Sequence, residues 1–139
     1  MNSKIIRPCV VLESPYAGDT RKNTHYARLC MHDSIMRGEA PIASHLLYTQ
    51  PYILDDNDPF ERAMGIACGL AWLPKASYSV FYTDRGWSTG MLGALHEHNL
   101  RHNYPFRIRS LEGEPVLPAT LDEDLENLLR AYIERTRPR

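Results

Sequence analysis

The polar turn formed by residues 82–91, with the sequence YTDRGWSTGM, contains the residue types best suited to binding chemistry. It directly follows an apolar run, residues 78–81, and leads into a predicted helix. A buried strand that ends in a Gly/Ser/Thr-rich turn and opens a helix presents free backbone N–H groups and the positive end of a helix dipole. Such a turn can bind a phosphate, a carboxylate or a sugar oxygen, although many turns of this composition only join a strand to a helix. A second turn of this kind, residues 14–19, follows the first apolar strand.

Ligands of parallel α/β sheets bind beyond the carboxyl ends of the strands, near the point where the strand order reverses. Four segments are therefore expected to converge: residues 14–19, 44–50, 55–58 and 83–91. The candidate ligand-binding residues in these segments are Ser14, Tyr16, Gly18, Asp19, His45, Asp55, Asp84, Ser88, Thr89, Gly90 and Met91.

Several of these candidates also have a purely structural interpretation. Residues 14–16 could form a plain turn, or could offer a hydroxyl, backbone N–H groups and an aromatic ring to a ligand. His45 could be a structural histidine or could hydrogen-bond a sugar hydroxyl, and both readings stay open. Residues 55–56 could be solvated loop charges or could bind a ribose diol or a base amine. Asp58 is best explained as a helix cap.

The spacing of residues gives little support for a metal site or a catalytic triad. His98 and His102 share a helical face, but Glu97 does not stand in an HExxH frame and no thiol or carboxylate completes a ligand set. We therefore expect no metal and no cofactor, and we interpret this face as an ordinary polar helix surface. No catalytic triad can be assigned from spacing.

Composition excludes several classes of partner. The formal net charge is −1 and no Lys/Arg cluster is longer than two residues, which argues against a nucleic-acid binder. No apolar run approaches the roughly 20 residues of a membrane span, and the N-terminal apolar segment is too short for a signal peptide. Cys9, Cys30 and Cys68 are odd in number and embedded in apolar segments, so we expect buried free thiols in a cytoplasmic protein.

The elements that must position the candidate residues alternate along the chain. Short apolar runs predict strands at residues 9–13, 41–43, 77–82 and 106–109, with the last near an edge because its pattern alternates. Helices are expected to begin near Asn23 or Thr24, at Asp58, at Ser88 or Thr89, reaching about Asn103, and at Thr120. This order predicts one α/β domain over residues 1–139, with a doubly wound, mostly parallel sheet and helices on both faces.

Several segments together resemble the nucleoside 2-deoxyribosyltransferase-like family, and most closely its small members from phages and bacteria. The matching segments are SPYAGD at 14–19, Asn23 with YAR at 26–28, PIASHLLY at 41–48, LDDNDPFER at 54–62 and STGM at 88–91. The resemblance covers about residues 9–111. It implies a Rossmann-like fold that binds nucleosides or nucleotides, often as a dimer or larger assembly. It also implies that active members cleave or exchange an N-glycosidic bond through a Glu nucleophile six residues after the Ser.

Counting six residues from Ser88 leads to Ala94, so the position that the resemblance assigns to the nucleophile carries no carboxylate. Alanine cannot form a glycosyl-enzyme intermediate. Glu97 lies nearly one helical turn further on and would reach the site only if the helix were shifted or rotated by about 60°. Glu97 and Asp84 remain the candidate catalytic residues if a reaction occurs.

The sequence thus favours a non-catalytic binder of a nucleotide or nucleoside, acting as a sensor or sequestering protein and assembling as a homo-oligomer. The ribose and phosphate would be held by the two Gly-containing turns, while Tyr16 would cover the sugar or base. The alternative is an N-glycosidase or 2-deoxyribosyltransferase, and a third class is a purely structural oligomeric module.

Overall fold

The computed structural model describes residues 6–119 and 122–135. Its centre is a four-stranded parallel sheet with the strand order β2-β1-β3-β4. The strands are β1 (Cys9–Glu13), β2 (Ala40–Ile42), β3 (Tyr78–Tyr82) and β4 (Phe106–Arg109). All three neighbouring pairs are parallel, with Leu12 opposite Val80 and Phe81 opposite Ile108. The fold is therefore the predicted Rossmann-like α/β arrangement, and β4 lies at the predicted edge of the sheet.

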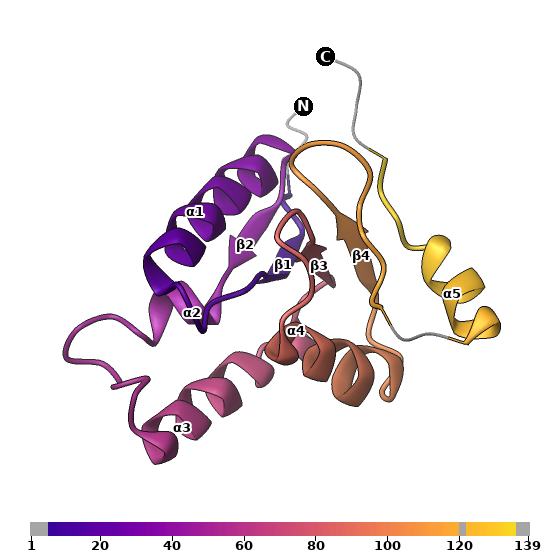
Figure 1. The fold of residues 1–139 in the computed structure, drawn as a ribbon. Helices are drawn as coiled ribbons and strands as arrows, with labels where there is room; N and C mark the ends of the chain where they lie inside the picture. The colour runs from indigo at the N-terminus through magenta and orange to yellow at the C-terminus, as the bar shows by residue number, and fades with distance from the viewer. Residues whose placement is uncertain (1–5, 120–121, 136–139) are drawn as a thin grey trace.

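Helices cover both faces of this sheet (Figure 1). On one face lies α1 (Thr20–Met36), and on the other lie α4 (Thr89–Gly93), its π-helical continuation η2 (Ala94–Leu100) and α5 (Glu123–Arg130). Three further elements follow β2 before the chain returns to the sheet: α2 (Ser44–Leu47), α3 (Pro59–Leu70) and the short 3₁₀ turn η1 (Leu73–Lys75).

Two apolar clusters, one on each face, hold these layers together. Alternate residues of a strand point to opposite faces, so Val10 and Leu12 pack with Tyr26 and Cys30 of α1. On the opposite face the buried cluster consists of Phe81, Met91, Ala94, Leu95, Phe106, Ile108 and Leu129. The same alternation directs Glu13, two residues after Val11, away from α1.

The helix starts follow ordinary capping chemistry. Asp19 accepts a hydrogen bond from the Lys22 backbone N–H and caps α1 four to five residues before the predicted cap, Asn23 or Thr24. Asp58 caps α3, with Pro59 as its first residue, and Ser88 caps α4, both as predicted. Asp122 caps α5, whereas the predicted cap Thr120 lies outside the described residues.

Several sequence-based expectations were wrong in detail. The helix predicted from Ser88 to about Asn103 is α-helical only to Gly93 and then widens into a π-helix. The four-residue helix α2 was not predicted. Cys30 is buried, but Cys9 and Cys68 are exposed, because Cys9 starts its strand at the sheet margin and no residue of α3 is buried. Within the described residues, no helix is long and apolar enough to cross a membrane.

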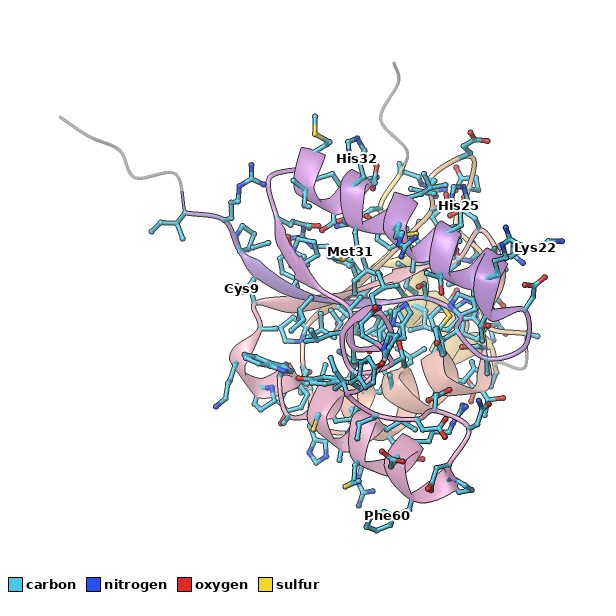
Figure 2. The ribbon with its side chains drawn as sticks, turned by 90° about the vertical axis from the view of Figure 1, so that its left-hand side faces the viewer. Cys9, Lys22, His25, Met31, His32 and Phe60 are labelled. Atoms are coloured by element: carbon cyan, nitrogen blue, oxygen red, sulfur yellow. The ribbon has the colours of Figure 1, made fainter. Side chains whose placement is uncertain are left out.

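Helix α3 packs closely against α2 and the loop after it at two glycines, Gly65 and Gly69. A Cβ atom on Gly69 would lie 2.7 Å from Ser44 Cβ, and one on Gly65 would lie 3.3 Å from Leu54 Cδ1. The absence of side chains at these two positions lets α3 approach α2 and the loop that follows it. Large apolar residues of α3 face outward instead: Phe60 is 73% exposed and points away from the molecule (Figure 2).

Candidate functional site

A cavity of about 760 Å³ opens at the carboxyl edge of the sheet, and it lies within the size range of small-molecule sites. Its walls come from the end of β1, the loop after β1, α2, α3 and the start of α4 with η2. Eight of the eleven residues predicted to bind a ligand line it: Ser14, Tyr16, Gly18, His45, Ser88, Thr89, Gly90 and Met91. The topological prediction that separate turns converge on one cavity is confirmed for these residues.

A polar cluster stands on the β1 side of the cavity. Ser14 Oγ and His45 Nε2 are 2.7 Å apart and share a hydrogen bond, and the Tyr16 ring meets the His45 ring edge-on at 6.0 Å. Burial lowers the pKa of His45 to about 4, so its imidazole is neutral at physiological pH. A neutral imidazole can donate one hydrogen bond and accept another, which suits it to hydroxyl or amide groups.

The loop that presents Ser14 and Tyr16 is held by α1. The Asn23 side-chain amide donates to the carbonyl oxygens of Tyr16 and Ala17, at 3.0 and 3.1 Å. Gly18 then turns the chain at φ +96°, a conformation that side chains rarely adopt. The loop therefore presents Tyr16 to the cavity from a fixed backbone.

The start of α4 forms the opposite wall. Ser88 Oγ accepts a hydrogen bond from the Met91 backbone N–H at 3.2 Å, which fixes the first turn of the helix. A Cβ atom placed on Gly90 would have only Ser88 Oγ nearby, at 3.9 Å. Gly90 therefore leaves open space in the cavity wall and is not needed for helix packing.

Ala94 and Glu97 both border the cavity, further along the helix that begins at Thr89. Ala94 is buried and belongs to the apolar cluster of that face. Glu97 lies on the π-helical segment, is well exposed and has a guanidinium nitrogen of Arg101 3.7 Å from its carboxylate. The helix thus brings the Glu97 carboxylate to the margin of the cavity. At Ala94, where the resemblance implies a nucleophilic Glu, the cavity wall has only a methyl group.

Three predicted residues lie elsewhere. Asp84 was wrongly placed at the cavity, because its carboxylate accepts hydrogen bonds from Tyr26 Oη and from the backbone N–H groups of Leu111 and Glu112. It anchors the loop after β4 to the β3 turn. Asp19 is occupied as the α1 cap, and Asp55 lines a smaller neighbouring cavity of about 480 Å³.

Glu13, the last residue of β1, was not predicted from the sequence. It lines the cavity and is partly buried, and burial raises its pKa from 4.5 to about 7. A charged residue directly after the apolar run 9–12, in a central strand, was the signal that could have revealed it. Asp56, for which the sequence left a binding role open, also borders the cavity, as do Glu61, Arg62 and His98, which were not predicted to bind a ligand.

Comparison with solved structures identifies a protein with the same fold. The structure of a 2-deoxyribosyltransferase from Bacillus psychrosaccharolyticus superposes with a TM-score of 0.62 and 13% identity, over 90% of this chain and 82% of that one. This similarity supports the fold relationship that the resemblance implied.

No protein of curated function matches the chain. The model of one family, described as a domain of unknown function (DUF7768), matches residues 8–109. The chain therefore belongs to the DUF7768 family.

Proposed function

We propose that the 760 Å³ cavity binds a nucleoside or nucleotide and that the protein is a non-catalytic binder, a sensor or sequestering protein for such a metabolite. The observation that carries the proposal is the convergence of Ser14, Tyr16 and His45 with the start of α4 on one cavity at the carboxyl edge of a parallel sheet. A hydroxyl, a neutral imidazole and an aromatic ring suit the hydroxyls and the planar base of a nucleoside.

The proposal that the protein does not turn its ligand over rests on Ala94. The resemblance to deoxyribosyltransferase-like proteins implies a nucleophilic Glu at this position, and a methyl group cannot attack the anomeric carbon. Affinity without a nucleophile is what a sensor or a sequestering protein requires.

Gly90→Val and Tyr16→Ala test the site. Gly90→Val puts branched carbons into the open wall, and Tyr16→Ala removes the ring that would cover the ligand. We expect each change to weaken nucleoside or nucleotide binding at least about tenfold in isothermal titration, corresponding to a loss of about 1.4 kcal/mol or more. The midpoint of thermal unfolding of Gly90→Val should change little, since a Cβ at this position meets no packed group. Wild-type affinity in both variants would place the site elsewhere.

The alternative function is an N-glycosidase or 2-deoxyribosyltransferase, and the position of Glu97 at the cavity margin favours it. Chromatography of a nucleoside incubated with the protein separates the two functions. A binder returns the ligand intact, whereas free base released at an enzymatic rate and abolished by Glu97→Ala would establish the enzyme.

The proposal includes a homo-oligomeric, cytoplasmic protein. Phe60, Ile66 and Trp72 are 73%, 52% and 43% exposed on or next to α3, and a second copy of the chain would cover them. The exposed free thiols of Cys9 and Cys68 suit a reducing compartment. Light scattering of the purified protein measures the mass of the assembly.

A further inference from the structure

One of the four carboxylates that line the cavity differs from the others. The Glu13 carboxylate has no hydrogen bond or ion pair with any residue that the structure describes. The other three each have a partner: Asp56 with Arg62 at 3.2 Å, Glu61 with the Asp55 backbone N–H at 3.4 Å, and Glu97 with Arg101 at 3.7 Å. The cavity therefore contains one acidic group whose hydrogen-bonding capacity is unused.

The backbone holds this group firmly in place. Glu13 ends β1, a central strand, and pairs in register with Phe81 of β3. The next residue is Ser14, which hydrogen-bonds His45 on the cavity wall. A glutamate is almost never buried without a partner, and here burial raises the pKa of Glu13 to about 7. The empty cavity thus leaves the ionised carboxylate poorly stabilised, and a ligand with hydrogen-bond donors would stabilise it.

The remaining charges of the cavity disfavour an anionic ligand. Against four carboxylates the lining has one guanidinium, that of Arg62, and this group is already paired with Asp56. His45 is neutral at physiological pH. A phosphate would add like charge to this acidic lining, whereas an uncharged ligand would not.

We propose that Glu13 selects the ligand: its carboxyl group accepts hydrogen bonds from O–H or N–H donors of an uncharged nucleoside, so that the cavity binds nucleosides in preference to their phosphates. This inference rests on the proposed function and narrows it. It also replaces the expectation that the Gly-containing turns hold a phosphate. The ribose hydroxyls and the N–H groups of the base offer the same donor chemistry to Glu13.

Calorimetric titration of the full chain with the four ribonucleosides and their 5′-monophosphates tests the preference. The wild type is expected to bind its best nucleoside at least about tenfold more tightly than the matching monophosphate. Glu13→Gln, which keeps the shape and removes the charge, is expected to lose about tenfold in nucleoside affinity and to narrow that ratio. Glu126→Gln on α5 removes one carboxylate that does not line the cavity, and it should behave as wild type.

A 2′,3′-dideoxynucleoside separates the two sources of donors. If the loss in Glu13→Gln disappears with this probe, Glu13 binds the 2′- or 3′-hydroxyl, and if the loss persists, Glu13 binds the base or the 5′-hydroxyl, which the probe retains. Both results support selection by Glu13.

Two results would overturn the inference. A wild-type protein that prefers the monophosphate, or a Glu13→Gln variant with unchanged nucleoside affinity, would leave nucleotide binding intact but remove Glu13 as the selecting residue. A wild type that binds neither series would refute the proposed function itself. If Glu13→Gln did not fold, the wild type alone would test the preference: tighter binding of the nucleoside than of its monophosphate supports the inference, and the reverse order overturns it.

Discussion

At the scale of single residues, Glu13 makes the empty protein less stable than it could be. Its carboxyl group is partly buried and ionises with a pKa of about 7 instead of 4.5, because burial penalises the charged form. Between these pH values the folded chain binds more protons than the unfolded chain. The free energy of unfolding therefore falls as pH rises through this window.

Glu13→Gln is expected to remove this pH-dependent penalty. At pH 8 the midpoint of thermal unfolding should be higher than that of the wild type by a few degrees, on the order of 4 °C for each kcal/mol gained. The difference should shrink as pH falls below about 7 and vanish below pH 4.5, where the wild-type carboxyl becomes protonated in both states. Scanning calorimetry at pH 5, 6.5 and 8 measures this. An equal or lower midpoint for the variant at pH 8 would show that the ionised carboxylate has a favourable partner in the empty protein.

At the scale of elements, α3 depends on two contact glycines. Ser44 Cβ lies where a side chain on Gly69 would begin, so the spacing between α2 and α3 is set by the absence of that atom. Both helices line the cavity. The helix contact and the shape of the cavity are therefore coupled.

Gly69→Ala and Gly93→Ala form a matched pair. In Gly93→Ala the new methyl group meets nothing within 4 Å, so the gain in helix propensity should stabilise the fold by up to about 1 kcal/mol. In Gly69→Ala the same gain is opposed by a contact of 2.7 Å, so we expect net destabilisation. Urea unfolding gives both values. Equal stabilisation by the two changes would contradict the close packing of α3 on α2.

Local chemistry explains which elements could be predicted from the sequence. The cap and proline at Asp58-Pro59 predict the start of α3, and the apolar run of residues 78–81 predicts β3, because both signals act within a few residues. Asp84 was misplaced for the opposite reason: its hydrogen-bond donors are distant in the sequence, at Leu111 and Glu112, 27 and 28 residues away, and at Tyr26, 58 residues away. Glu13 was missed because its unpaired state is visible only once its neighbours are placed.

At the scale of the whole molecule, a buried ionic cluster joins distant parts of the chain. The Arg109 guanidinium donates two hydrogen bonds to Glu39, at 2.7 and 2.9 Å, and its Nε lies 2.6 Å from Glu134. Arg109 and Glu39 are 1% and 3% exposed. Burial alone would raise the pKa of Glu39, but hydrogen bonds from Arg109, Tyr78 and Ser34 outweigh it and lower the pKa to about 2.

Glu39→Gln should destabilise the fold strongly at neutral pH, by on the order of 3 kcal/mol, because the buried guanidinium loses its main partner. Since the pKa of Glu39 is lowered on folding, its contribution is present above pH 4.5 and is lost as pH falls toward 2. The gap between wild type and variant in urea unfolding should therefore narrow from pH 7 to pH 3. The exposed Glu126→Gln serves as control, with a cost below about 1 kcal/mol. If the difference in free energy of unfolding between wild type and Glu39→Gln stayed constant from pH 7 to pH 3, the ionised pair of Glu39 and Arg109 would not be its cause.

The same cluster has a consequence for the outer edge of the sheet. After α5 the segment that contains Glu134 runs alongside β4. The Ile108 N–H donates to the Tyr132 carbonyl at 2.8 Å, and the Glu134 N–H donates to the Ile108 carbonyl at 2.7 Å. These two bonds form the stub of a fifth parallel strand. They occupy the backbone groups that an open edge strand would offer to a strand of another molecule. By holding this segment against β4, the ion pair between Arg109 and Glu134 is expected to oppose edge-to-edge aggregation as well.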